Sequence, residues 1–294
     1  MKKILPMTIV CATHNGAKRL PILLNSILKN THLPQQIIIC GTSFSDFKFI
    51  NLHKYKILNI KKIISKIKNQ KYQRDLAIKS VVTNIIAQCD DDLELELNYV
   101  KKSYNHFKYK KNSKKIVSAA ILFKNHNHQA IRWNNAFYDT KIYRFILLLL
   151  NFGTRLKYMS VLSSGRIIPL LPKEFLIKNK KTKIINNLQW VCSTIIYTKS
   201  AIKDAFFYIP EEGKKSYFED VFFSHSLYLK NYDLMIDRSI IAYHPITQKT
   251  DLDIYLKTIK SQLKIVHVFK KSKIMFYIDV FVFLLIFVFL KIFK

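Results

Sequence analysis

Short apolar runs alternate with helix-like stretches through the first ninety residues, and this alternation restricts the fold more than any other feature. Apolar, strand-like runs occupy residues 7–12, 36–40 and 83–89, and residues 57–60 offer another. Helix-like stretches fall between them, one at residues 73–82 and one with an apolar face of Leu20, Leu23, Leu24, Ile27 and Leu28. Because strands separated by helices pair in parallel through right-handed crossovers, the pattern predicts an α/β fold with a mostly parallel sheet.

The second half of the chain is less regular. Strands are predicted at residues 115–122, 188–197 and 234–243, and helices at residues 217–230 and 251–273. The length of 294 residues suits one large domain or one domain with an appendage, and 49% hydrophobic residues supply a real core. The four cysteines have no zinc-binding spacing, so we expect buried, reduced thiols in a reducing cytoplasm.

Negative charge is scarce in this chain but concentrated at one place. Lysine and arginine number 49 against 19 acidic residues, yet Asp90, Asp91, Asp92, Glu94 and Glu96 lie within seven consecutive positions. One interpretation is a helix start, where carboxylates interact favourably with exposed N–H groups. The other is a Mg²⁺ or Mn²⁺ site with bound phosphate, because adjacent carboxylates repel one another unless a cation offsets their charge. The cluster follows a predicted strand, where open α/β sheets bind ligands, but this stretch alone supports both interpretations.

Several segments, in this order, resemble the family 2 glycosyltransferases. The resemblance runs from about residue 7 to about residue 246 and is carried by TIVCATHNGAKRLPILLNSI, QRDLAI, CDDDLEL, LQWVCSTIIYTKSAI, YFEDVFFSHSLYLKNYDLMI and AYHP. It implies a GT-A type fold, in which a Rossmann-like, mostly parallel sheet is flanked by helices. It also implies transfer of a sugar from a nucleotide-diphosphate donor to a hydroxyl of a glycan or lipid-linked acceptor. Residues 163–166, SSGR, are similar to bacterial members that build surface polysaccharides.

The resemblance assigns roles to particular residues. A divalent metal, Mn²⁺ or Mg²⁺, would be held by Asp90, Asp92 and His244. A UDP- or dTDP-sugar donor would contact Thr13, His14, Asn15, Arg74, Asp90 and Asp91. Asp220 would be the catalytic base of a single displacement with inversion, and Glu219 would orient the acceptor. Each of these residues also has a structural interpretation, such as a strand-to-helix turn for residues 13–15, a surface arginine or a packed histidine.

One departure from the family pattern concerns the nucleotide base. Members of the family usually end their second strand in an aspartate that reads the base, whereas Gly41 and Thr42 occupy that place here. Asp46 lies close by in sequence, but the sequence does not decide whether it compensates. An alternative is therefore a protein that keeps the GT-A fold but has lost transfer.

The sequence near the carboxyl end predicts a second region that follows the glycosyltransferase domain. We expect a glycosyltransferase domain over residues 1–250, with a nucleotide-sugar half over about 1–112 and an acceptor half over about 113–250, and a helical, membrane-associating tail over 251–294. Residues 274–290 are apolar except for Asp279, which fits a membrane span, an interfacial helix or a buried core helix. The formal charge of +30 fits an anionic membrane, an anionic substrate or nucleic acid, but no nucleic-acid-binding motif occurs. We expect a location on the cytoplasmic side of the cell membrane and no nucleic-acid partner; a non-enzymatic basic membrane- or nucleic-acid-binding protein is the other alternative.

Overall fold

The computed structural model describes residues 2–51, 53–109, 113–123, 145–146, 148–149, 159–168, 183–192, 194–205, 217–245 and 252–292. The chain divides into two compact units. The first takes Met1–Ala130, Lys181–Asn187 and Val191–Ile246, and the second takes Ile131–Lys180, Leu188–Trp190 and Thr247–Lys294. The domain boundary expected near residue 250 stays a prediction.

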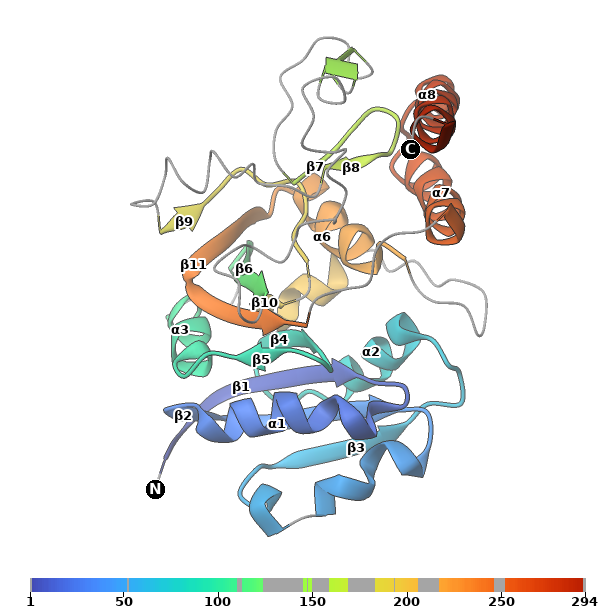
Figure 1. Ribbon diagram of the computed structural model, residues 1–294. Helices are drawn as coiled ribbons and strands as arrows, with labels where there is room; N and C mark the ends of the chain where they lie inside the picture. The colour runs from blue at the N-terminus through green and yellow to red at the C-terminus, as the bar shows by residue number, and fades with distance from the viewer. Residues whose placement is uncertain are drawn as a thin grey trace. The chain divides into compact units, whose positions relative to one another are not determined.

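A mixed sheet forms the centre of the first unit (Figure 1). Among the described residues it has nine strands in the order β3-β2-β1-β4-β10-β6-β11-β5, and β9 pairs with β11. The strand bounds are β1 Lys3–Ala12, β2 His32–Gly41, β3 Ile60–Ile64, β4 Ile85–Asp90, β5 Glu94–Leu95, β6 Lys115–Phe123, β9 Ile184–Ile185, β10 Ile195–Thr198 and β11 Asp233–His244. Helical segments of this unit are η1 Gly16–Lys18, α1 Leu20–Lys29, η2 Phe44–Asn51, η3 His53–Tyr55, α2 Gln70–Lys79, α3 Tyr99–Asn105, η4 Lys199–Lys203 and α6 Glu219–Leu229.

The first four strands of the sheet are parallel to one another, as the sequence predicts. The apolar runs of β1, β2 and β4 are continuous because these strands are buried on both faces; β4, for example, is buried from Ile85 to Cys89. The edge strand β3 has no buried residue. On the apolar face of α1, Leu20, Leu23, Leu24 and Ile27 are buried and Leu28 is half-buried, and α2 packs against β1 and β2. A mixed α/β architecture with a parallel-rich sheet flanked by helices is thereby confirmed.

The remaining strands make the sheet mixed. β10 lies between β4 and β6 and is antiparallel to both, whereas β6 and β11 are parallel. The long strand β11 has an irregular register between Asp237 and Ile241 and ends at His244. This ending brings a histidine from late in the chain to the sheet that carries the acidic cluster.

Three predicted elements differ from the observed ones. β3 begins at Ile60 instead of residue 57, because the preceding residues form a turn in which the N–H of Leu58 donates to Tyr55 O at 3.0 Å. The strand expected at 188–197 is confined to β10, since the N–H of Val191 donates to the hydroxyl of Ser224 at 3.0 Å instead of joining a ladder.

The helix predicted over 251–273 is α7, Leu252–Val268, and a separate helix, α8, covers Lys273–Ile292. Between them, Lys270 adopts a left-handed φ of 50°, which a continuous helix does not allow. The second unit also contains a short hairpin of β7, Ser160–Val161, and β8, Ile167–Ile168. Among the described residues, no helix combines the length and the apolar character that crossing a membrane requires.

Candidate active site

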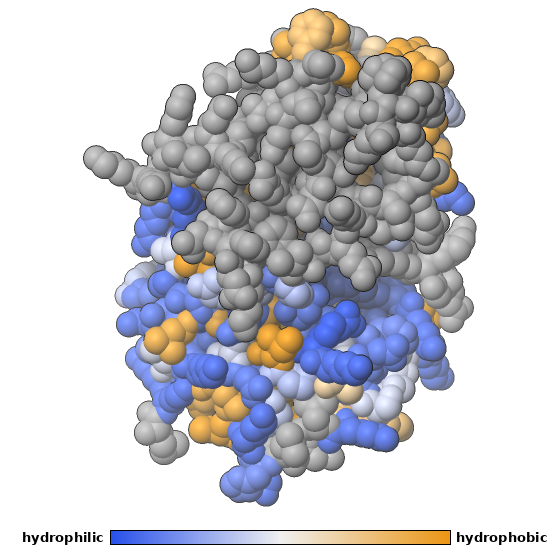
Figure 2. Space-filling model, in the orientation of Figure 1, coloured by the Kyte–Doolittle hydropathy of each residue, from blue (hydrophilic) through white to orange (hydrophobic). Residues whose placement is uncertain are grey.

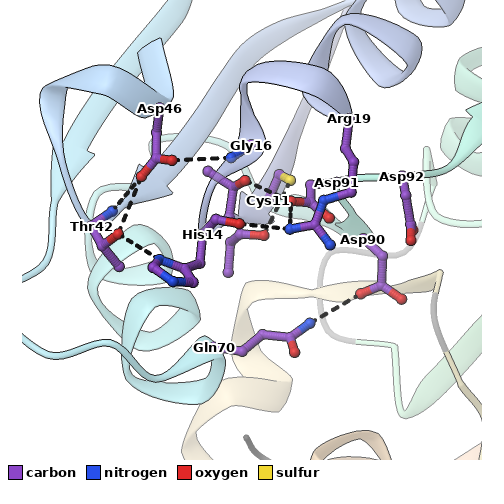
Figure 3. A network of polar contacts seen from close by, with 12 residues as sticks. Cys11, His14, Gly16, Arg19, Thr42, Asp46, Gln70, Asp90, Asp91 and Asp92 are labelled. Carbon is purple, nitrogen blue, oxygen red and sulfur yellow. Dashed lines mark hydrogen bonds and ion pairs between the residues drawn. The ribbon is translucent and has the colours of Figure 1, made fainter. Parts of the chain in front are cut away.

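The acidic cluster lies where the chain order of the parallel strands changes direction. β1 stands between β2 and β4, and Ala12 at the end of β1 is paired with Asp90 at the end of β4. The carboxyl ends of two neighbouring parallel strands therefore meet here, which is the general ligand-binding position of open α/β sheets. Figure 3 shows the polar side chains that gather at this place.

Three of the predicted ligands form one group. Single ligand atoms of Asp90, Asp92 and His244 all lie within 4.8 Å of one another. The Nε2 atom of His244 is 3.6 Å from Oδ1 of Asp92, which is longer than a hydrogen bond. This Oδ1 atom is buried and has no hydrogen-bond partner among the described residues. Carboxylate oxygen and imidazole nitrogen are ligands that Mn²⁺ accepts, so the group fits a divalent ion.

The pKa of Asp92 supports a cation at this position. Burial raises the pKa of this carboxyl, and the negative charge of Asp90 raises it further, while His244 lowers it. A divalent ion between the two carboxylates would cancel both unfavourable effects. Asp90, Asp92 and His244 could therefore hold a divalent ion.

The side chain of Asp91 interacts with Thr13 and Arg19. Its Oδ2 atom accepts a hydrogen bond of 2.6 Å from the hydroxyl of Thr13 and forms an ion pair of 3.0 Å with Arg19. Burial raises the pKa of Asp91 to about 6, although Thr13 and Arg19 both lower it. Asp91 thus anchors the loop after β1, where the donor was expected to bind. No sequence pattern predicted a role for Arg19, which lies one residue before α1.

The loop after β1 is built by residues far apart in sequence (Figure 3). Asn15 has a left-handed φ of 56°, a conformation that asparagine tolerates. Nδ1 of His14 is 2.9 Å from the hydroxyl of Thr42, and the N–H of Gly16 donates to Oδ1 of Asp46 at 3.0 Å. These contacts place the predicted donor-binding residues 13–15 beside the end of β2.

The carboxylate of Asp46 lies at the end of β2. It is 1% exposed and accepts hydrogen bonds from the N–H groups of Thr42 at 2.9 Å and Ser43 at 3.2 Å, besides that of Gly16. Burial raises its pKa, but these hydrogen bonds outweigh burial, and the net pKa is lowered. Asp46 therefore organises the two loops that the resemblance assigned to the nucleotide base.

Arg74 lies inside the site and links its two acidic parts. Its guanidinium forms ion pairs with Oδ1 of Asp90 and with Oε1 of Glu219, and the residue is only 5% exposed. The surface-arginine interpretation is wrong, since both partners and burial fix this side chain. The adjacent Gln73 donates to Thr13 O at 2.6 Å and Cys40 O at 2.8 Å, which ties the ends of β1 and β2 together.

The two carboxyl groups at the start of α6, those of Glu219 and Asp220, have raised pKa values. Burial is the largest effect and, with the negative charge of Asp90, raises the pKa of Glu219 to about 7 and that of Asp220 to about 6. Arg74 lowers both, but less than burial raises them. The residue before them, Phe218, has a left-handed φ of 61°, a strained conformation of the kind that clusters at functional sites. A carboxylate with a pKa near 6 is suited to general-base catalysis.

Comparisons with known proteins bear on the fold. No family model matches the chain, and no curated protein does. Among solved structures, residues 1–349 of S. aureus TarS in complex with UDP-GlcNAc match with a TM-score of 0.51 and 16% identity, over 89% of this chain and 66% of that one. GalNAc-T7 with UDP, GalNAc and Mn²⁺ matches with a TM-score of 0.60 and 14% identity, over 90% of this chain and 48% of that one. The chain has the GT-A fold.

The GT-A assignment agrees with the resemblance found in the sequence. The match to full TarS, at a TM-score of 0.51 and 16% identity, covers 88% of this chain but 39% of that one. The chain thus spans less than two thirds of the length of each of these structures. At this level of identity the likeness establishes the GT-A fold, and the roles of the site residues rest on the geometry above.

Proposed function

We propose that the protein is a metal-dependent glycosyltransferase that moves a sugar from a nucleotide-diphosphate donor to a hydroxyl of a glycan or lipid-linked acceptor. The observation that carries this proposal is the group of Asp90, Asp92 and His244 at the strand ends of a GT-A fold. Arg74 connects this group to the carboxylates of α6. Residues that could hold a metal ion and two buried carboxylates thus lie in one site.

The donor would bind between the metal ligands and the loop after β1. Asp90, Asp92 and His244 would hold Mn²⁺ or Mg²⁺, which when bound neutralises charge on the diphosphate as a Lewis acid. The loop of residues 13–15, fixed by Asp46 and Asp91, would enclose the base and ribose of a UDP- or dTDP-sugar. The solved structures of TarS with UDP-GlcNAc and of GalNAc-T7 with UDP support a uridine donor.

Asp220 would act on the acceptor. Its carboxylate takes the proton of the acceptor hydroxyl, whose oxygen bonds to the anomeric carbon as the bond from that carbon to the diphosphate breaks. A single carboxylate base supports one displacement with inversion at the anomeric carbon. Glu219 holds Arg74 by an ion pair, so it would orient the site and leave the proton transfer to its neighbour.

The acceptor and location are part of the same proposal. A lipid-linked or surface-polysaccharide acceptor in a bacterium would bring the protein to the cytoplasmic side of the cell membrane, bound peripherally or anchored by its C-terminal segment. The support is the formal charge of +30 and the apolar sequence of residues 274–290. No nucleic-acid partner is proposed.

Calorimetric titration with UDP, in the presence and absence of Mn²⁺, tests the site. We expect binding that requires the metal and is abolished by Asp92→Ala, because one ligand is removed. Asp233→Ala is the matched control, since this aspartate is exposed at the opposite end of β11 from His244 and should bind as the parent does.

The outcomes separate the alternatives. Binding that is the same with and without Mn²⁺, or that survives Asp92→Ala, would refute the metal assignment. Metal-dependent binding without hydrolysis or transfer of any donor in a panel of nucleotide sugars would indicate a GT-A protein that has lost activity. No nucleotide binding at all would favour a non-enzymatic basic protein.

A further inference from the structure

Helix α8 of the second unit presents an apolar face to solvent. The exposed side chains are those of Ile274, Tyr277, Ile278, Phe281 and Leu285, with exposed fractions of 40–70%. They recur every three or four residues, so they lie on one side of the helix. Figure 2 shows hydrophobic side chains along the edge where Figure 1 draws α8. A helix covered only by water would carry polar residues at these positions.

The opposite face of α8 holds the only polar residue of the apolar segment 274–290. Phe276, Asp279 and Phe283 are buried there, and Asp279 is 1% exposed. Both carboxylate oxygens of Asp279 lie 2.8 Å from Nε of Arg166, and Oδ2 also accepts a hydrogen bond of 2.8 Å from Gln262 of α7. The Arg166 guanidinium lies over the ring of Phe283, 4.8 Å from its centre.

The Arg166–Asp279 pair fixes the rotation of the helix. Turning α8 to hide its apolar face would expose the Asp279 carboxylate and leave the Arg166 charge buried without this partner, which is strongly unfavourable. Arg166 is itself held in the turn between β7 and β8, where Gly165 has a φ of 75° and a Cβ on it would lie 2.6 Å from Val266. The apolar face is therefore directed outward by the packing of the unit.

The charges around this face indicate what covers it. From Leu256 to the end of the sequence there are eight lysines, and the single acidic residue is Asp279, whose charge is paired inside the unit. Lys260, Lys270 and Lys273 are exposed next to or on the two helices. A second copy would bring the same positive charge to this surface and be repelled, whereas anionic lipid headgroups attract it.

We propose that the outward face of α8 inserts into the headgroup region of an anionic membrane, with the helix lying in the plane of the surface. The Arg166–Asp279 pair holds the inserting side chains toward the lipid, and the lysines of α7 and of the turn before α8 contact the headgroups. The inference deepens the membrane location proposed above. It rests on that proposed location but not on sugar transfer.

Vesicle flotation of the full chain tests the proposal. The probes are vesicles of phosphatidylcholine alone and of phosphatidylcholine mixed with phosphatidylglycerol. We expect the parent to float with the mixed vesicles, less so at high salt, and weakly with phosphatidylcholine alone. Phe281→Glu should weaken binding to the mixed vesicles by at least about tenfold, because it places a charge in the inserting face. Ile57→Glu is the matched control, since Ile57 is 61% exposed in the first unit and should have no effect.

Fluorescence of single tryptophan substitutions tests the rotation of the helix. Tyr277→Trp should shift to shorter wavelength on the mixed vesicles, whereas Phe276→Trp, at a position already buried, should not. Failure of the parent to float, full binding by Phe281→Glu, or an equal shift at both tryptophan positions would overturn the proposal. The proposal would also be overturned if the parent formed a dimer in the absence of lipid and Phe281→Glu made it monomeric, because a second copy would then cover the apolar face. Calorimetry with UDP and Mn²⁺ should be unchanged in Phe281→Glu, so a failure of the catalytic proposal is recognised separately.

Discussion

Replacing Asp220 with asparagine should make the protein more stable and less active at the same time. Burial, with Asp90 nearby, raises the pKa of Asp220 from 3.8 to about 6. Above pH 6 the carboxylate is therefore charged in an environment that disfavours its charge. Asparagine has nearly the same shape and no charge, so it relieves this cost, but it cannot accept the proton of the acceptor hydroxyl.

The size of the effect follows from the pKa. A rise of about two units corresponds to about 3 kcal/mol in favour of the neutral form. This pKa already includes the hydrogen bond that the carboxylate accepts from the N–H of Val221 at the start of α6, so the stabilisation by asparagine should be about 3 kcal/mol. The effect depends on pH. A carboxyl group whose pKa is raised in the folded state destabilises that state above the raised pKa, and it has no effect at a pH where the group is protonated in both the folded and the unfolded state. The stabilisation should be complete above about pH 6 and vanish as the pH falls toward about 4.

Two measurements check this prediction. Urea unfolding without metal or nucleotide, at several pH values, gives the stability of Asp220→Asn relative to the parent, with Asp233→Asn as an exposed control. Transfer should fall by about 10²-fold or more, while affinity for UDP with Mn²⁺ hardly changes. An asparagine variant that is less stable than the parent at neutral pH, or one that loses nucleotide binding together with transfer, would refute the reasoning.

Two further substitutions address residues that support the site, and a third addresses Asp237 of β11. Arg74→Met should lower the free energy of unfolding by about 3–5 kcal/mol in urea titrations and abolish metal-dependent nucleotide binding, because it leaves two carboxylates without their buried partner; equal stability would contradict this. Gly16→Ala should lower stability by about 1–3 kcal/mol in thermal unfolding and weaken UDP binding, since its Cβ would lie 2.0 Å from the Thr13 hydroxyl; unchanged binding would show that the loop adapts. Asp237→Asn should lower the free energy of unfolding by about 2 kcal/mol at neutral pH, because hydrogen bonds from His106 and from the hydroxyl and N–H of Ser239 lower the Asp237 pKa from 3.8 to about 2 despite burial. In urea unfolding, the difference from the parent should disappear as the pH falls from about 4 to about 2.

Much of the first half of the fold could be predicted from the sequence. Local periodicity locates β1, α1, β2, α2 and β4, because buried parallel strands need continuous apolar runs and helices need one apolar face. The same reasoning places Asp90, Asp91 and Asp92 at the end of a strand. It could not define the limits of β3 and β10, since turns and side-chain hydrogen bonds compete with the sheet there.

The partners of these residues were decided by tertiary structure. His244 joins Asp90 and Asp92 because the end of β11 pairs with β5, where Tyr243 lies opposite Glu94, and no local pattern specifies that pairing. The sequence did not show what Asp46 contacts, and only the folded loops show that its carboxylate accepts hydrogen bonds from three backbone N–H groups; whether it compensates for the missing base-reading aspartate stays a prediction.

For the C-terminal segment, too, the sequence determines one part of the structure and the tertiary contacts determine another. The sequence by itself determined that residues 274–290 form an apolar segment interrupted by Asp279, and that lysines surround it. Only the tertiary structure decided which side of α8 is buried, because the partner of Asp279 is Arg166, 113 residues earlier in the chain. Apolar side chains alone leave the rotation of such a helix undetermined, whereas one buried charge permits only the orientation in which it meets its partner.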